Sequence, residues 1–210
     1  MIRVLIVDDH KILRQGLKQI LAETKDMVVV GEAENGLQTL KLVREIEVDV
    51  LLLDISMPDK NGIEVLKQLR KEHPKLAVLI LSMYREDQYA VQALKAGASG
   101  YLTKQSAPEL LVTSIRHVAS GRKYVSPSVA ERLADILGGD TEKLPHETLS
   151  YREHQTLCLI ASGKTLTGCA AEMSLSVKTV SVYRSRLLEK MKLKNNAELT
   201  HYAIKHQFVE

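Results

Sequence analysis

The chain has 210 residues, of which 45% are hydrophobic and 26% are charged, a balance typical of a globular protein and not of a disordered one. No apolar run approaches the roughly 20 residues that a membrane-spanning helix needs, and Met1-Ile2-Arg3 leads directly into a predicted strand. The two cysteines, Cys158 and Cys169, are not spaced with other Cys or His as in a zinc site, so we expect reduced thiols in a cytoplasmic protein.

The net charge of +3 is unevenly distributed along the chain. Residues 1–121 contain 16 basic and 16 acidic residues and are neutral. Between residues 176 and 194, by contrast, six Lys or Arg residues stand against a single Glu. A local basic segment of this kind is typical of an element that binds a polyanion such as nucleic acid.

The first half of the chain alternates apolar runs of strand length with amphipathic helical periods. The predicted strands span 2–7, 28–32, 48–53, 77–81 and 99–102. The predicted helices span about 10–23, 36–45, 61–72, 86–95 and 107–120. Five such units predict an α/β fold with a doubly wound parallel sheet, because right-handed crossovers place helices on both faces.

Four of these strands end in polar side chains. Asp8 and Asp9 follow the first strand, Asp54 the third, Ser82 the fourth and Lys104 the fifth. Open α/β sheets place their chemistry at this end of the strands. Carboxylates a few Å apart resist full ionisation unless a cation joins them, and such oxygen ligands suit Mg²⁺. Because a hydroxyl and an ammonium suit phosphoryl oxygens, the pattern predicts a phosphoryl-transfer site.

Further residues match a known family, namely Tyr101, Met57-Pro58, Gly62 and Ala96-Gly97-Ala98. With them, residues 1–121 resemble the receiver domain of bacterial two-component response regulators. The resemblance implies a strand order of 2-1-3-4-5 and an Asp54 that accepts a phosphoryl group from the histidine of a sensor kinase. It also implies a switch formed by Ser82 and Tyr101, with Lys104 beside the phosphoryl group. The implied Mg²⁺ ligands are Asp8, Asp9, Asp54 and the main-chain carbonyl of Ser56.

Residues 122–147 lose this periodicity and contain Pro127, Gly138-Gly139 and Pro145. They predict a linker with a helical turn around Ser128 to Leu137. From residue 148 onward the pattern is entirely helical. Ser150 and Glu153 have capping-box spacing, and further helices are predicted over about 165–173, 177–191 and 197–206.

A short helix, a tight turn and a longer basic helix predict a small all-α helix-turn-helix domain. Within 177–191, the side chains predicted to face inward are Val180, Leu187, Leu188 and Met191. Those predicted to contact DNA are Lys178, Thr179, Ser181, Val182, Arg184, Ser185, Lys190, Lys192 and Lys194. The last helix carries an apolar face predicted to pair two copies of the chain, formed by Leu199, Tyr202, Ala203 and Ile204.

Residues 148–207 resemble the LuxR-type DNA-binding domain of the NarL/FixJ response regulators. The matching segments are Leu149-Ser150-x-Arg152-Glu153, Ile160-Ala161-Ser162-Gly163 and Leu175-Ser176-x-Lys178-Thr179-Val180. Tyr183-Arg184-x-Arg186 and Glu198-Leu199-Thr200-His201 are most similar to the GacA/UvrY branch. The resemblance implies a receiver over 1–121, a linker over 122–147 and a DNA-binding domain over 148–210. The implied partners are a sensor histidine kinase, double-stranded DNA and a second copy of the chain.

One segment departs from that family, because Gly168-Cys169 stands where the second helix usually has better helix formers. Glycine costs roughly 1 kcal/mol there, so we expect a less stable second helix. This segment supports one alternative, in which the helical domain is an adaptor that contacts only proteins.

A second alternative is an aspartyl-phosphate enzyme such as a haloacid-dehalogenase-like phosphatase. Those enzymes carry another Asp two residues after the nucleophile, where this chain has Ser56, so we expect no enzyme. The sequence favours a phosphorylation-controlled transcription factor.

Overall fold

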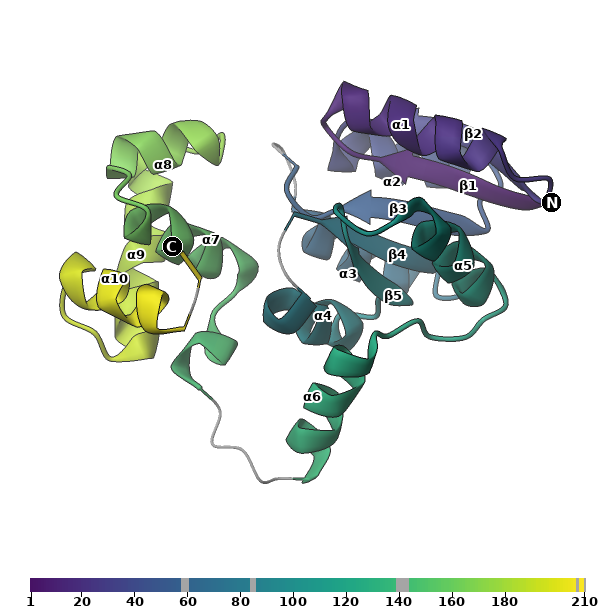
Figure 1. Cartoon of the computed structure of the whole chain (residues 1–210). Helices are drawn as coiled ribbons and strands as arrows, with labels where there is room; N and C mark the ends of the chain where they lie inside the picture. Colours follow the sequence, from purple (N-terminus) through teal and green to yellow (C-terminus); the bar gives the residue numbers. More distant parts are fainter. Residues whose placement is uncertain (58–60, 84–85, 139–143, 207, 210) are drawn as a thin grey trace. The chain divides into compact units, whose positions relative to one another are not determined.

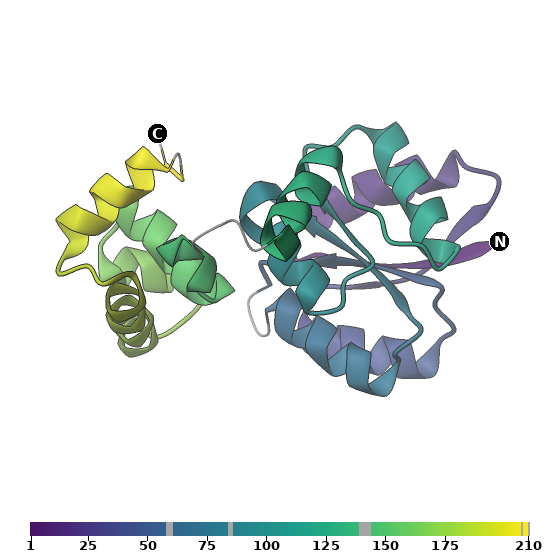
Figure 2. The same ribbon diagram turned by 90° about the horizontal axis from the view of Figure 1, so that it is seen from below.

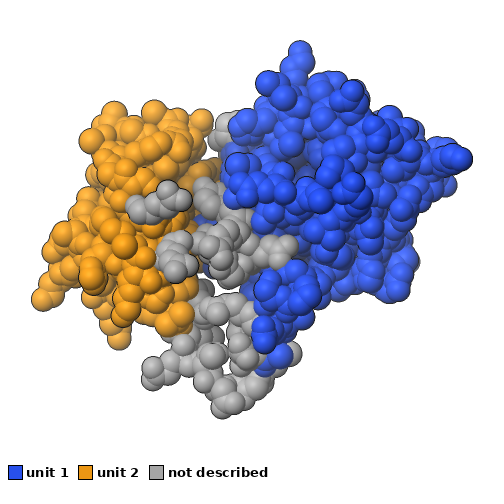
Figure 3. Space-filling model, in the orientation of Figure 1, with its two compact units in different colours: residues 1–139 blue, residues 140–210 orange. Residues whose placement is uncertain are grey.

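In a computed structural model, the described residues are 1–57, 61–83, 86–138, 144–206 and 208–209 (Figure 1). The chain divides into two compact units, unit 1 with residues 1–139 and unit 2 with residues 140–210 (Figure 3). The family match predicted at Pro58 and the linker residue Gly139 lie outside the described residues. Among the described helices, none is long and apolar enough to cross a membrane.

Unit 1 contains five parallel strands in the order β2-β1-β3-β4-β5, which confirms the predicted doubly wound sheet. Its elements are β1 (Ile2–Val7), α1 (Lys11–Ala22), β2 (Met27–Ala33), α2 (Gly36–Glu45), β3 (Val50–Asp54), α3 (Gly62–Glu72), β4 (Ala77–Ser82), α4 (Glu86–Lys95), β5 (Gly100–Thr103), α5 (Pro108–Ala119) and α6 (Pro127–Gly138).

Helices cover both faces of this sheet. On one face Ile6 of β1 and Leu52 of β3 share a core cluster with Leu21 of α1 and Ile115 of α5. Figure 2 shows α1 and α5 on this face and α2 and α3 on the opposite one. All five residues of β3 are therefore buried, which explains why its sequence is continuously apolar up to Asp54.

The chain turns sharply between β3 and α3. The Asn61 side chain caps α3 by accepting a hydrogen bond of 2.7 Å from the Ile63 N–H. The Gly62 N–H donates to the Ile55 carbonyl oxygen at 3.0 Å, and a Cβ at Gly62 would clash with the carbonyl oxygen of Asp54. Glycine is required by this close approach, which holds the end of β3 against the start of α3.

The segment after α5 packs back onto unit 1. The Tyr124 N–H donates to the Ser99 carbonyl oxygen at 2.8 Å, and Tyr124 forms a parallel bridge with Gly100 of β5. Helix α6 then packs against α4, and Val129 of α6 is buried (Figure 1). Helix α6 agrees with the helical turn predicted around Ser128 to Leu137.

Unit 2 is wholly helical, as predicted. Its elements are η1 (Pro145–Thr148), α7 (Tyr151–Ala161), α8 (Leu166–Glu172), α9 (Val177–Met191) and α10 (Asn196–Lys205). The predicted capping box is present, because the Ser150 N–H donates to Glu153 Oε2 at 2.7 Å and the Glu153 N–H donates to Ser150 Oγ. Cys169 is fully buried in the core of this unit.

Two of the four residues predicted to form an apolar pairing face on α10 are used inside unit 2. Leu199 and Ala203 are fully buried in the core of unit 2, and Tyr202 packs against that core and bonds His146 Nδ1 through its hydroxyl at 2.8 Å. Only Ile204 of the four predicted residues is exposed, at 54%. A domain this small needs the apolar stripe of each helix for its own core, so Leu199 and Ala203 are not free to pair two copies, and a pairing role of α10 stays a prediction.

Candidate functional site

Three charged side chains meet at the carboxyl edge of the sheet in unit 1. Asp8 directly follows β1, Asp54 ends β3 and Lys104 directly follows β5. Asp8 and Asp54 are each 1% exposed. The Lys104 Nζ lies 2.6 Å from Asp8 Oδ2 and 2.9 Å from Asp54 Oδ2. The strand order places β1 beside β3, so the structure brings these predicted residues into direct contact.

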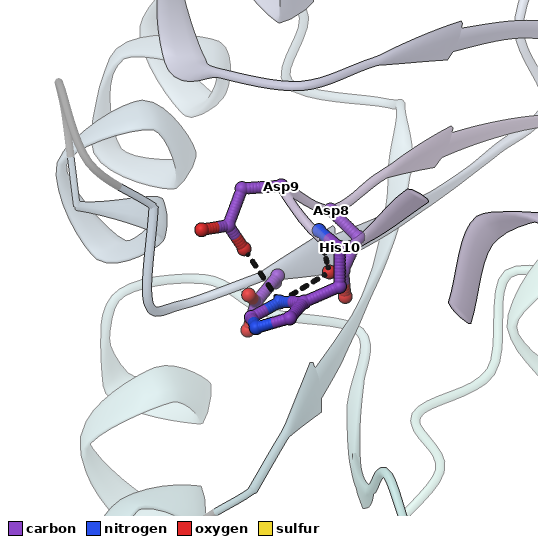
Figure 4. A group of neighbouring side chains, drawn as sticks. Asp8, Asp9 and His10 are labelled. Atoms are coloured by element: carbon purple, nitrogen blue, oxygen red, sulfur yellow. Dashed lines mark hydrogen bonds and ion pairs between the residues drawn. The ribbon is translucent and has the colours of Figure 1, made fainter. Parts of the chain in front are cut away.

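Asp9 and His10 form the solvent-facing rim of the same site. The His10 Nδ1 lies 2.8 Å from Asp9 Oδ1 and 3.2 Å from Asp8 Oδ1, and Figure 4 shows the imidazole turned toward both carboxylates. Four residues each offer one possible ligand atom, namely Asp8, Asp9, His10 and Asp54. These four atoms all lie within 4.8 Å of one another. Sequence reasoning missed His10, although its place directly after two acidic residues was a usable signal.

Burial and charge shift the pKa values inside the pocket. Burial raises the pKa of Asp54, and the Asp8 carboxylate raises it further, while Lys104 opposes both effects. Burial lowers the pKa of Lys104, but the two carboxylates outweigh burial and raise it overall. One cation therefore pairs with two buried carboxylates, and Asp9 adds a negative charge beside them. This arrangement attracts a further cation.

The donor set fits a hard divalent cation. Asp8, Asp9 and Asp54 supply the carboxylate oxygens that Mg²⁺ prefers. Lys104 lies closest to Oδ2 of both Asp8 and Asp54, and Asp8 Oδ1 faces the rim, where it accepts the His10 N–H at 2.8 Å. Ser56, the predicted main-chain ligand, lies in the loop directly after β3 and is half-buried.

Ser82 and Tyr101 lie on the two neighbouring strands. Ser82 ends β4, is fully buried, and its carbonyl oxygen accepts the Lys104 N–H at 2.7 Å. Asp54 pairs in register with Leu81, so Ser82 lies one residue further along the adjacent strand. Tyr101 of β5 is 2% exposed and therefore buried. The switch roles of Ser82 and Tyr101 stay predictions.

Arg14 of α1 is a second residue that sequence reasoning missed. It is 4% exposed, and its Nη1 donates to the Asp8 carbonyl oxygen at 2.7 Å. It also forms ion pairs with Glu32 and Glu34 at 3.2 and 2.6 Å. A charged residue between two apolar helix positions, Leu13 and Leu17, was the available signal. Arg14 fixes the backbone that carries Asp8.

In unit 2, α8 and α9 form the predicted helix-turn-helix. The turn contains Ser174 at φ 53, and Ser176 caps α9 by accepting the Thr179 N–H at 3.1 Å. The predicted inward face of α9 is confirmed for Val180, Leu187 and Met191, which are buried in the core, and Leu188 is half-buried and packs against that core. The same packing leaves a polar and basic face of α9 exposed.

Most of the predicted DNA contacts lie on that outward face. The exposed ones are Lys178, Val182, Ser185, Lys190, Lys192 and Lys194, and the partly exposed ones are Thr179, Ser181 and Arg184. Val182 is 41% exposed, an apolar group surrounded by polar neighbours. Arg186 is also exposed and basic, although it was not among the predicted contacts. The exposed polar and basic face of α9 therefore fits a nucleic-acid interface.

Lys190 has a partner inside unit 2. Its Nζ lies 2.6 Å from Glu153 Oε2, on a side chain that is 4% exposed. Burial raises the pKa of Glu153, but Lys190 and Ser150 outweigh it, so the pKa lies below its usual range. Lys190 therefore ties the end of α9 to the start of α7. The structure gives Lys190 an internal partner, and its predicted phosphate contact stays a prediction.

Two family profiles match the chain in the order of its two units. The profile of the response regulator receiver domain matches residues 4–116, and that of the bacterial regulatory proteins of the luxR family matches residues 147–203. With the parallel sheet, its acidic edge and the helix-turn-helix, these matches define a class: the chain belongs to the bacterial response regulators that carry a LuxR-type domain. It is a phosphorylation-dependent regulator of transcription.

The relatives point to one branch of that class. The chain is 36% identical to the response regulator GacA of Pseudomonas aeruginosa, with 100% of this chain and 99% of the relative covered. It is also 36% identical to the response regulator UvrY of Escherichia coli K12, with 98% and 95% covered. RcsB from Salmonella enterica serovar Typhimurium, solved bound to promoter rprA with phosphomimetic BeF3-, has a TM-score of 0.66 and 28% identity, with 96% and 97% covered. The predicted resemblance to GacA and UvrY is confirmed.

Proposed function

We propose that Asp54 accepts a phosphoryl group from the phosphohistidine of a sensor kinase and thereby controls promoter binding by α9. The observation that carries this proposal is the contact of one ammonium, Lys104 Nζ, with two buried carboxylates at 2.6 and 2.9 Å. Asp54 lies at the carboxyl end of the central strand β3, between β1, which Asp8 directly follows, and β4, which ends in Ser82. No other described acidic group combines this burial with this set of neighbours.

In the transfer, an oxygen of Asp54 forms a bond to phosphorus as the bond from phosphorus to the kinase histidine nitrogen breaks. The imidazole leaves with the electron pair of that bond, and Asp54 becomes an acyl phosphate. Lys104 favours the ionised form of Asp54 against the effect of burial, and its ammonium then faces the phosphoryl oxygens.

A bound Mg²⁺ would neutralise charge on the phosphoryl oxygens. The residues that would hold it are the carboxylates of Asp8, Asp9 and Asp54 and the main-chain carbonyl of Ser56. The exposed rim at Asp9 gives the pocket an open side toward solvent, from which a kinase histidine can approach.

The response then passes from Ser82 to the surface of unit 1. Ser82 moves so that its hydroxyl bonds the phosphoryl group. The ring of Tyr101 then occupies the space that Ser82 leaves. Two contacts give the change a route toward the linker: Tyr124 bridges to β5, and α6 packs on α4. We assign residues 1–121 to the receiver, 122–147 to the linker and 148–210 to the DNA-binding domain.

On DNA, the exposed side chains of α9 divide by chemistry. Ser181, Val182 and Ser185 contact base edges, whereas Lys178, Thr179, Arg184, Lys192 and Lys194 contact phosphates. Two copies bind two half-sites as a homodimer in the cytoplasm, and any contact through α10 uses its exposed face at Ile204.

Labelling with a small radioactive phosphodonor tests the assignment of Asp54. Wild type should be labelled when Mg²⁺ is present, and so should Asp26→Asn, which removes an exposed carboxylate distant in sequence from the pocket. Asp54→Asn should not be labelled. Label that persists in Asp54→Asn, or that is undiminished in excess chelator, would contradict the proposal.

A further inference from the structure

We propose that His10 supplies a nitrogen ligand to the metal site, so that the site binds a divalent transition ion such as Mn²⁺ more tightly than Mg²⁺. This inference rests on the proposed function, because it takes the acidic pocket of unit 1 to be a cation site. It adds to that function a residue outside the carboxylate set and a class of ion that this residue favours.

The spacing of the three rim donors matches that of ligands around one ion. Two ligands at right angles around an ion with bonds of about 2.1 Å lie about 3.0 Å apart. The His10 Nδ1 lies 2.8 Å from Asp9 Oδ1 and 3.2 Å from Asp8 Oδ1, so both separations are close to that value. Figure 4 shows the imidazole and the two carboxylates converging from consecutive residues.

The backbone holds His10 in this position. The His10 N–H donates to Asp8 Oδ1 at 2.8 Å, which ties the loop to the carboxylate beside it. His10 is the N-cap residue of α1, yet its side chain makes no capping hydrogen bond, and the ring faces the acids instead. The Arg14 guanidinium bonds the Asp8 carbonyl oxygen and anchors the other side of the same turn.

The two carboxylate oxygens of Asp8 contact different residues. Lys104 pairs with Asp8 Oδ2, whereas His10 contacts Asp8 Oδ1. Asp54 shares Lys104 and lies within the same group of ligand atoms as His10. The His10 side chain is 66% exposed, so solvent has access to the remaining positions around an ion bound at the rim.

Ligand chemistry then distinguishes the ions. Mg²⁺ prefers oxygen and gives up its water reluctantly, whereas imidazole is a good ligand for transition ions. The carboxylates contribute to both kinds of ion, but the His10 nitrogen contributes mainly to the transition ion. The same contacts have a competing interpretation, in which the imidazole only hydrogen-bonds the acids and is displaced by any cation. That interpretation predicts that removing His10 strengthens the binding of both ions alike.

The test uses the full-length protein, freed of metal, and measures free Mn²⁺ by its electron paramagnetic resonance signal during titration. Mg²⁺ affinity is obtained from displacement of the bound Mn²⁺. The variants are His10→Ala, Asp9→Asn and, as a matched control, His201→Ala, which removes an exposed histidine of unit 2. Spin-echo modulation of bound Mn²⁺ reports a directly bonded ¹⁴N nucleus.

We expect wild type and His201→Ala to bind one displaceable Mn²⁺ with ¹⁴N modulation. In His10→Ala the modulation should vanish, and the Mn²⁺ dissociation constant should rise about tenfold while that of Mg²⁺ changes by less than about twofold. The inference is overturned if wild-type Mn²⁺ shows no ¹⁴N modulation, or if His10→Ala shifts both ions equally or tightens them. Failure of the proposed function has a different signature, because Asp9→Asn would then bind both ions as wild type does.

Discussion

Unit 1 and unit 2 use their charged side chains in opposite ways. In unit 1 the functional charges point inward: Asp8, Asp54 and Lys104 are almost fully buried and pair with one another. In unit 2 the basic residues of α9 point outward, and a buried apolar stripe lies behind them. The pocket of unit 1 is therefore suited to an event at one residue, and the face of unit 2 to a broad contact with a polyanion.

Each unit contains one exception that sharpens the contrast. His10 is an exposed side chain attached to the buried pocket of unit 1. Lys190 is a basic residue of α9 that pairs with the buried Glu153. In both units, the position of a charged side chain along a strand or helix determines whether it is buried or exposed. A nearby partner of opposite charge can then give that side chain a different role.

The largest expected effect follows from removing the cation of the buried pocket. Lys104→Met leaves Asp8 and Asp54 without their shared partner, so the free energy of unfolding of unit 1 should fall by about 3 kcal/mol at neutral pH. The loss should shrink in acid, because the raised pKa of Asp54 lets it become neutral. Urea unfolding in the presence of chelator measures this. Lys95→Met, which removes an exposed lysine of α4, is the control, and equal stability of the two variants would contradict the account.

A buried titratable group makes unit 2 sensitive to acid. His154 is 3% exposed, with its Nδ1 3.4 Å from Cys158 Sγ and its ring 4.8 Å from that of Phe208. Burial, and then the charge of His146, lower the pKa of His154 from 6.5 to about 4. Between these values the unfolded chain binds a proton that the folded chain does not, so stability is complete above pH 6.5 and is lost as the pH falls toward about 4.

Across that range His154 should cost unit 2 about 3 kcal/mol of unfolding free energy. Urea unfolding at several pH values measures the slope. His154→Gln removes the titrating group and should flatten it, whereas His201→Gln, at an exposed position, should leave it unchanged. A slope that is the same in wild type and His154→Gln would rule out this source of acid sensitivity.

The Lys190–Glu153 pair allows a lysine with a structural partner to be compared with the lysines that we propose to contact DNA. Lys190→Met removes the cationic partner of the Glu153 carboxylate, and unit 2 should lose about 1–2 kcal/mol because the lysine of the pair is partly exposed. Lys192→Met, at an exposed position beside it, should keep its stability but bind all DNA sequences more weakly and with a flatter salt dependence. Thermal unfolding and salt-dependent DNA titration give the two readouts. The distinction fails if both variants keep full stability.

The smallest effect concerns the departure from the family in α8. A Cβ at Gly168 would meet Thr165 Oγ1 at 3.5 Å and Lys164 Cβ at 3.8 Å, which are ordinary contacts. Gly168→Ala should therefore stabilise unit 2 by up to about 1 kcal/mol. The Thr165 cap, which accepts the Gly168 N–H at 3.1 Å, remains available to the variant. Thermal unfolding measures the gain. A loss of stability in the variant would show that position 168 requires glycine, which would contradict this prediction.

The sequence was most informative where topology alone positions a side chain. Asp8, Asp54 and Lys104 each follow an apolar strand, and the ends of parallel strands share one edge of the sheet, so their meeting was predictable. The helices of unit 2 were equally predictable as elements, because capping residues such as Ser150 and Ser176 mark their starts.

The sequence was least informative where one element selects its partner on another. Nothing in the local periodicity of α10 says that Leu199 and Ala203 are used within unit 2, since an apolar stripe looks the same whether it packs inside one chain or between two. The pairing of Lys190 with Glu153 likewise depends on how α9 crosses α7. His10 was missed because its exposed position marks only a helix start, whereas its role depends on where the ring points.

The central claim is that an event in the buried pocket of unit 1 controls DNA binding by the exposed face of α9. Genome-wide footprinting of the full-length protein, with and without a phosphodonor, tests it most directly when wild type is compared with Asp54→Asn. We predict that the phosphodonor increases occupancy at paired half-sites for wild type and leaves the occupancy of Asp54→Asn unchanged. Equal occupancy of wild type and Asp54→Asn in the presence of phosphodonor would contradict the claim.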